Sequence, residues 1–325
     1  MIGHEWAVTL LRRGLASGRV AHAYLFCGPP QVGKTTLAVR LAQALNCGEP
    51  DPPCGQCGPC RKIWEGTHPD VRRVTGEGAG SSIKIGQIRD LQREAVLLPY
   101  EGQRRVFVLE RIDLASIEAA NSLLKTLEEP PGHVVLALTA DHAEALPATV
   151  VSRCQRLDLR PVAQDRVEAA LVSRGIEPGR ARLLARLSGG RVGWALEASQ
   201  DEALLARRQK GLDQLVELLS AGRVARLDFA AKTARDAAAC RELVELWAVW
   251  WRDLLLLGSQ GGEHLVNVDR QAELGALAGA CDTAQAWAAL QALQTTIGRL
   301  EANVNTRLAL EGLVLNLPYL QALPA

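Results

Sequence analysis

Runs rich in apolar and β-branched residues alternate with amphipathic segments up to about residue 160. The runs are AYLF (23–26), VRRV (71–74), VFVL (106–109) and VVLALT (134–139), and segments such as TLAVRLAQAL and IEAANSLLKTLEE lie between them. Almost wholly apolar strands separated by helices are typical of a parallel sheet with helices on both faces. The pattern therefore predicts an α/β domain over residues 1–160.

The β pattern then disappears, and Ala, Leu and Arg dominate the remainder of the chain. Residues 161–203 predict three short helices separated by glycines, and residues 204–325 predict a separate unit of longer amphipathic helices. Trp247, Trp250 and Trp251 recur at helical spacing in this last unit. The spacing favours a helix packed into a core, with an aromatic patch facing a partner as the alternative.

Composition and charge describe an ordinary soluble globular protein. Hydrophobic residues make up 48% of the 325 residues, charged residues make up 22%, and the formal net charge is +1. The sequence has no apolar stretch long enough to span a membrane and no signal-peptide layout, so we expect a cytoplasmic location. A near-neutral chain also argues against tight, independent binding of nucleic acid, which normally needs a concentrated basic surface.

The segment GPPQVGKT (28–35) matches the pattern G-x-x-x-x-G-K-[ST], directly after the run AYLF and directly before a helical segment. In that context, backbone N–H groups and a helix N-terminus surround phosphates, the lysine reaches the β- and γ-phosphates, and the Ser or Thr binds Mg²⁺. The alternatives are a loop that matches the spacing by chance and a true P-loop that no longer binds nucleotide. The predicted residues for ATP or ADP with Mg²⁺ are Gly28, Gly33, Lys34, Thr35 and Thr36.

Glu110 follows the run VFVL, at the sheet edge where the P-loop is also expected. An acid at this position approaches the magnesium bound by Thr35, directly or through water. The next residue is Arg111, which cannot accept a proton from water, so the general base of an ATPase is missing from its usual place. An ordinary surface ion pair is the other role open to Arg111, and Asp113 lies on the loop beyond.

Cysteines crowd into the segment CGEPDPPCGQCGPC (47–60). Clustering of this kind in a cytosolic chain indicates a metal site rather than disulfides. The thiolates of Cys47, Cys54, Cys57 and Cys60 have a spacing that can close a tetrahedron around a structural Zn²⁺. An iron–sulfur cluster is less favoured, because the further Cys and Pro of the ferredoxin run are missing after Cys60. Metal-free thiols are the third interpretation.

Arg153 lies in the tripeptide SRC (152–154), downstream of the run VVLALT. An exposed arginine at a domain edge suits donation into the nucleotide site of a neighbouring subunit, where it stabilises phosphoryl charge in trans. A surface or interdomain ion pair is the other interpretation, and the residues alone leave both open.

Taken together, these stretches resemble the delta-prime family of clamp-loader subunits of bacterial DNA polymerase III, within the AAA+ group. The similar stretches cover nearly all of residues 2–160 and include HAYLFCGPPQVGKTT, the four cysteines, AANSLLKTLEEPP and LPATVVSRCQ. The resemblance implies a RecA-like P-loop domain (1–160) with an inserted zinc module (47–60). It further implies a small helical lid (161–203) and an all-α collar (204–325), which match the family only in layout.

The resemblance also implies partners and residue roles. The partners are tau/gamma and delta subunits in a five-membered ring, which opens the beta sliding clamp and places it on primer-template DNA. Carried over by position, the roles fall on Lys34 and Thr35 (P-loop pair), Glu110 (magnesium acid), Arg111 (place of the water-activating Glu), Thr139 (sensor on the fourth strand), Arg153 (trans-acting finger) and the four cysteines (zinc ligands, with a shorter first gap than the family pattern).

The departures from the motor subunits of this family concern hydrolysis. A tau/gamma subunit carries an acid at the place of Arg111 and a nucleotide-reading arginine in its lid, where this chain has Gly193, with Arg191 two residues earlier. We therefore predict a non-hydrolysing stator that belongs to the DNA polymerase III holoenzyme, is not itself the polymerase, and binds nucleotide passively. The alternatives are a tau/gamma-type ATPase subunit and a P-loop, zinc-containing regulator that binds nucleic acid.

Overall fold

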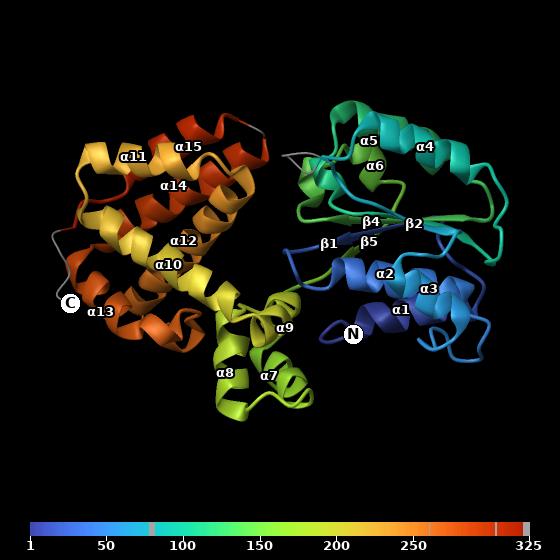
Figure 1. Ribbon diagram of the computed structural model, residues 1–325, viewed down its shortest axis with the longest axis horizontal. Helices are drawn as coiled ribbons and strands as arrows, with labels where there is room; N and C mark the ends of the chain where they lie inside the picture. Colours follow the sequence, from blue (N-terminus) through green and yellow to red (C-terminus); the bar gives the residue numbers. More distant parts are fainter. Residues whose placement is uncertain (78–81, 260, 303, 321–325) are drawn as a thin grey trace. The chain divides into compact units, whose positions relative to one another are not determined.

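A five-stranded parallel sheet forms the centre of the N-terminal part of the protein (Figure 1). The computed structural model describes residues 1–77, 82–259, 261–302 and 304–320. The strand order is β2-β3-β4-β1-β5, and every neighbouring pair is parallel. The strands are β1 (Ala23–Cys27), β2 (Val71–Val74), β3 (Arg105–Leu109), β4 (Val134–Ala140) and β5 (Gln155–Asp158).

Burial explains which strands the sequence pattern reveals. Every residue of β1, β3 and β4 is buried, whereas only Leu157 of β5 is. The predicted α/β domain with a parallel sheet is confirmed, but the edge strand β5 was not predicted. It has one buried residue, Leu157, whereas the other edge strand, β2, has a buried valine at each end.

Helices cover both faces of the sheet, as predicted (Figure 1). On one face lie α1 (Glu5–Ala16), α2 (Lys34–Asn46) and α3 (Gly58–Glu65); on the other lie α4 (Ile85–Ala95), α5 (Ile117–Glu128) and α6 (Ala148–Val151). Successive strand residues point to opposite faces: Leu25 packs in the core beneath α4 and α5, and Phe26 packs in the core beneath α1 and α2. Two apolar cores thus hold the sheet from both sides.

The carboxyl ends of the parallel strands meet at one edge of the sheet. Gly28 follows β1, Glu110 follows β3, and Asp141 follows β4. A short 3₁₀ turn follows each of these two acids: η1 (Ile112–Leu114) follows Glu110, and η2 (Ala143–Ala145) follows Asp141. Ligands of open parallel sheets bind at this edge, so the fold places the predicted phosphate loop and the predicted magnesium acid side by side.

The chain divides into two compact units. The first comprises Met1–Val167 with Gly190–Gly193, and the second comprises Glu168–Gly189 with Trp194–Ala325. The three short helices predicted after residue 160 are present as α7 (Gln164–Val172), α8 (Pro178–Leu187) and α9 (Val192–Gln200). The finer division into 1–160, 161–203 and 204–325 stays a prediction.

The described part of the second unit is helical. Its remaining helices are α10 (Glu202–Ser220), α11 (Arg223–Thr233), α12 (Ala237–Gly258), α13 (Gln271–Ala280), α14 (Thr283–Glu301) and α15 (Thr306–Asn316), with 3₁₀ turns η3 (Gly262–His264) and η4 (Val268–Arg270). Trp247, Trp250 and Trp251 are fully buried in its core, so the prediction that they pack inside is confirmed. None of the described helices is long and apolar enough to cross a membrane.

Candidate functional site

Two glycines shape the loop that joins β1 to α2. Gly28 has φ +140° and Gly33, the N-cap of α2, has φ +111°. A Cβ atom on Gly28 would lie 2.1 Å from the carbonyl oxygen of Leu159. The predicted strand–loop–helix context of GPPQVGKT is therefore present, and the loop runs too close to neighbouring backbone for a side chain at its first position.

Gly28→Ala is expected to destabilise the first unit, because φ +140° strains any residue with a Cβ and the new methyl group would meet Leu159 O. Backbone strain alone costs about 1–3 kcal/mol. Urea unfolding of the full chain measures the change. The matched control is Gly132→Ala, where a Cβ meets nothing within 4 Å; equal losses in the two variants would contradict the constraint at Gly28.

Lys34 is buried and turned into its own loop. Its Nζ donates to Gly28 O at 2.6 Å and to Pro29 O at 2.8 Å, and it pairs with Asp141 Oδ1 at 2.6 Å. The side chains of Lys34 and Asp141 are 7% and 3% exposed. Asp141 was not predicted as a site residue, although it follows a buried strand directly, the same signal that indicated Glu110.

Thr35 and Glu110 are brought together as predicted. Thr35 Oγ1 donates to Glu110 Oε2 at 3.3 Å. The other carboxylate oxygen, Oε1, accepts bonds from Arg73 Nη2 at 2.6 Å and Nε at 2.9 Å. A hydroxyl and a carboxylate oxygen are ligands that Mg²⁺ accepts, so these residues fit a nucleotide-bound magnesium. The neighbouring Thr36 is exposed at the start of α2.

Arg111 occupies the position after Glu110 in a left-handed conformation, with φ +53°. Its backbone N–H donates to Thr139 Oγ1 at 3.0 Å, and its Nη2 lies 3.6 Å from Asp141 Oδ2. Thr139 is itself buried. The predicted sensor residue thus ties the end of β4 to the residue after Glu110, and the side chain of Arg111 approaches an acid of the site.

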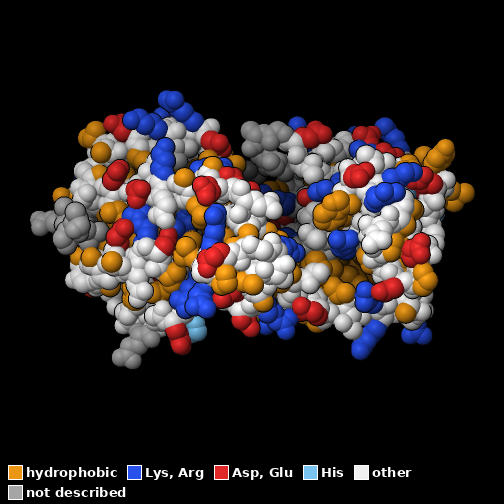
Figure 2. Space-filling model, turned by 60° about the horizontal axis from the view of Figure 1, so that its bottom comes forward, with side chains coloured by type: hydrophobic (Ala, Val, Ile, Leu, Met, Phe, Trp, Pro, Cys, Tyr) orange, Lys and Arg blue, Asp and Glu red, His pale blue; other side chains and the backbone are white. Residues whose placement is uncertain are grey.

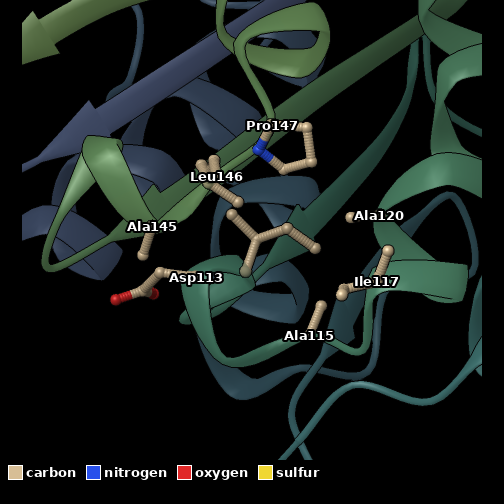
Figure 3. A pocket seen from close by; sticks show the side chains of 8 residues that line it. Asp113, Ala115, Ile117, Ala120, Ala145, Leu146 and Pro147 are labelled. Atoms are coloured by element: carbon tan, nitrogen blue, oxygen red, sulfur yellow. The ribbon is translucent and has the colours of Figure 1, made fainter. Parts of the chain in front are cut away.

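Asp113 lies in η1, close to Asp141. Its Oδ2 accepts the backbone N–H of Asp141 at 3.0 Å, and its buried Oδ1 has no hydrogen-bond partner among the described residues. Burial, and then the negative charge of Asp141, raise the pKa of Asp113. Its carboxylate lies at the Ala145 side of a pocket of about 280 Å³ (Figure 3). The pocket is otherwise lined by Ile112, Ala115, Ile117, Ala120, Leu146 and Pro147, so it is predominantly apolar and does not suit a phosphate.

Gly193 lies against the P-loop within the first unit. Its backbone N–H donates to Gln31 O at 2.8 Å, and a Cβ on it would lie 2.9 Å from the same oxygen. Gln31 has φ +58°, and the next carbonyl, Val32 O, lies 3.0 Å from His4 Nε2. The sequence placed Gly193 where a motor subunit has an arginine, and the structure shows the chain too close to the loop for a side chain there.

The four predicted metal ligands converge. Their sulfur atoms lie within 4.8 Å of one another, with Sγ–Sγ distances of 3.9 Å for Cys47 and Cys57 and 4.0 Å for Cys54 and Cys60. A tetrahedron with Zn–S bonds of about 2.3 Å has edges of roughly 3.8 Å. The donor set and its dimensions therefore fit a structural zinc.

Helix ends and backbone amides set this geometry. Cys47 is the C-cap of α2, Cys57 is the N-cap of α3, and Cys60 lies in α3. The backbone N–H groups of Gln56 and Cys57 donate to Cys54 Sγ and lower its pKa to about 7. A thiol with a lowered pKa is more easily converted to the thiolate that binds metals.

Arg153 lies at the surface just after α6. Its Nη2 pairs with Glu128 Oε1 of α5 at 2.8 Å, and its Nη1 donates to Thr149 O at 3.0 Å. The two paired side chains are 36% and 50% exposed. The guanidinium is accessible to solvent, and in the isolated chain it makes a surface ion pair.

Several proteins with similar sequences are subunits of DNA polymerase III. The family described as "DNA polymerase III, delta subunit" matches residues 3–163. DNA polymerase III subunit tau of Salmonella typhimurium is 36% identical over 212 residues, which cover 63% of this chain and 32% of that protein. DNA polymerase III subunit delta' of Bacillus subtilis is 35% identical over 211 residues, which cover 65% of this chain and 63% of that protein.

A solved structure also shows a similarity. It is described as a DNA polymerase III, gamma subunit-related protein from Thermotoga maritima, with a TM-score of 0.44 and 17% identity over 94% of this chain and 97% of that chain. The sequence matches are shorter: they span about a third of the tau relative and under two thirds of the delta' relative.

Proposed function

We propose that this chain, a member of the clamp-loader family of DNA polymerase III subunits within the AAA+ group, is a delta-prime-type subunit that does not hydrolyse ATP. In this role it completes a five-membered ring with tau/gamma and delta subunits in the cytoplasm. The ring loads the beta sliding clamp onto primer-template DNA during replication. The chain serves as a stator whose own nucleotide site is passive.

The residue after Glu110 carries this proposal. A guanidinium stays protonated at neutral pH and cannot take a proton from water. Arg111 instead directs its guanidinium toward Asp141, 3.6 Å away, and its backbone N–H binds Thr139. General-base catalysis typically contributes ~10²–10⁴-fold in rate. Nucleotide at Gly28, Gly33, Lys34, Thr35 and Thr36 would therefore be held with little turnover.

The start of α9 supports the same role. A motor subunit reads its nucleotide with an arginine where this chain has Gly193. Here the backbone of Gly193 binds Gln31 O directly, and its missing Cβ is what permits that approach. The site therefore lacks two groups that act during hydrolysis.

Two further sites belong to this proposal. Arg153 is the finger for a neighbouring ATPase site, supported by its exposure and by the fact that its carboxylate partner, Glu128, is itself half exposed. The sealed set of four cysteines takes a structural Zn²⁺ with no open coordination position. Zinc would tie the end of α2 to α3, whose backbone is already joined by the bond from Gln43 Nε2 to Cys60 O at 2.6 Å.

A tau/gamma-type ATPase is the second candidate, because subunit tau is as similar to this chain as subunit delta' and the P-loop is intact. Hydrolysis by the purified full chain with ATP, Mg²⁺ and primed DNA separates the two. We expect a rate at least ~10²-fold below that of a motor subunit with its base, and the same residual rate for Lys34→Ala. Multiple turnovers that Lys34→Ala abolishes would identify an ATPase.

A regulator that binds nucleic acid on its own is less well supported. On the face that Figure 2 shows, Lys and Arg side chains are interspersed with Asp and Glu rather than gathered into one field. Independent binding to DNA relies on neutralising several phosphates at once. We therefore assign contact with DNA to the assembled ring.

A further inference from the structure

The P-loop lysine already has a full set of acceptors inside the protein. Lys34 Nζ lies 2.6 Å from Gly28 O, 2.8 Å from Pro29 O and 2.6 Å from Asp141 Oδ1. An ammonium group has three donor hydrogens and no acceptor, so these three bonds use all of its donors. A phosphate oxygen can bind Lys34 only by displacing one of the three.

Asp141 is the acceptor that a phosphate would displace. The carbonyls of Gly28 and Pro29 belong to the loop itself, whereas Asp141 comes from the end of β4, 107 positions away from Lys34. It is also the anionic member of the set, and its side chain is only 3% exposed. Charges removed from water attract and repel more strongly, so this carboxylate both retains Lys34 and repels an entering phosphate.

Arg111 offers Asp141 a second cation. Arg111 Nη2 lies 3.6 Å from Asp141 Oδ2, on the carboxylate oxygen that Lys34 does not contact. Removing one partner of a buried ion pair is costly when the other charge is left alone. Because Arg111 is in place, the Asp141 carboxylate still has a cationic partner when Lys34 leaves it. Asp113, whose Oδ2 accepts the backbone N–H of Asp141, is a second acidic group beside this site.

We propose that Asp141 competes with nucleotide phosphate for Lys34 and thereby sets the nucleotide affinity of this P-loop. This inference rests on the proposed function only in taking the P-loop as a nucleotide site. Binding exchanges a carboxylate for a phosphate at Lys34, while Arg111 keeps Asp141 paired. The apparent affinity equals the intrinsic affinity multiplied by the fraction of molecules in which Lys34 is released, so a small released fraction weakens binding.

Titration calorimetry of the full chain with ADP and with ATP, each with Mg²⁺, tests the proposal. Asp141→Asn keeps the size of the side chain but removes its charge. We expect at least about tenfold tighter binding, since the variant frees a donor of Lys34 and removes a repelling charge. The matched control is Glu144→Gln, an acid three residues on with a side chain that is 78% exposed, whose affinity should equal that of the wild type.

Unchanged or weaker binding by folded Asp141→Asn would overturn the proposal, because an acid that merely anchors Lys34 gives that result. The gain should vanish in the double variant Lys34→Ala, Asp141→Asn. If thermal unfolding shows that Asp141→Asn is not folded, Asp141→Ser makes the same comparison. The two proposals can fail separately. ATP turnover by the isolated chain would contradict the non-hydrolysing role but not the competition between Asp141 and phosphate. Unchanged affinity of Asp141→Asn would contradict the competition but not the non-hydrolysing role.

Discussion

Arg153→Ala is expected to lower ATP turnover by the reconstituted ring by about 10³-fold or more at the site that Arg153 enters, the lower end of what an arginine finger contributes. The chain itself should stay folded, because the residue lies at the surface and its ion pair with Glu128 is solvated. Exposed pairs of this kind contribute only about 0–1 kcal/mol. The measurement is steady-state hydrolysis with clamp and primed DNA, with thermal unfolding of the isolated variant beside it.

Two variants from the same surface sharpen this test. Arg156→Ala removes an arginine of similar exposure that pairs with Asp158 at 2.7 Å, and it should leave turnover unchanged. Glu128→Gln frees Arg153 from its partner and should leave turnover unchanged or raise it. If Arg153→Ala and Arg156→Ala turn over ATP at the same rate as the wild type, Arg153 has no part in the mechanism and makes only the ion pair.

Cys60→Ser is expected to abolish binding of about one zinc per chain and to lower the thermal stability of the first unit. The Cys60 side chain is fully buried and carries one of the four sulfur atoms of the cluster. A serine hydroxyl stays protonated near neutral pH, so it cannot replace the thiolate as a zinc ligand. Zinc that holds a fold together binds with about 10–16 kcal/mol in zinc-finger peptides. Elemental analysis and thermal unfolding of the purified chain measure the two effects.

Cys281→Ser is the matched control, because this cysteine is nearly buried in the second unit and lies outside the cluster. It should keep the full zinc content. A chain freed of metal by a chelator that unfolds at the same temperature as the zinc-bound chain would refute a structural role. Iron and sulfide in the purified protein, in place of zinc, would instead indicate the iron–sulfur cluster that the cysteine spacing makes the less favoured alternative.

The fold class was predictable because its central strands are buried on both faces. Apart from Arg105 at the start of β3, the residues of β1, β3 and β4 are apolar or small, so the sequence itself displays these strands as runs. The strand β5 carries no such mark, because three of its four residues are not buried. The P-loop and the cysteine cluster were also predictable, since each depends on residues close together in sequence.

The partners of the site residues were not predictable in the same way. The sequence placed Lys34, Glu110 and Arg111 at one edge of the sheet, but it did not indicate that Asp141 would pair with Lys34 or that Arg73 would pair with Glu110. Those pairs depend on which strand lies beside which. The order β2-β3-β4-β1-β5 sets β4 next to β1 and β2 next to β3, and so brings Asp141 and Arg73 to their partners.

The sequence by itself determined a parallel sheet with a phosphate loop, an acid without its neighbouring base, and four clustered thiols. These features need only local spacing and the periodicity of buried positions. Tertiary structure alone decided that the P-loop lysine is already paired and that Gly193 lies against Gln31. The physical reason is that the partner of a buried charge or carbonyl is the group that the folded backbone places beside it. That group can be far away in the sequence, so local sequence patterns do not indicate it.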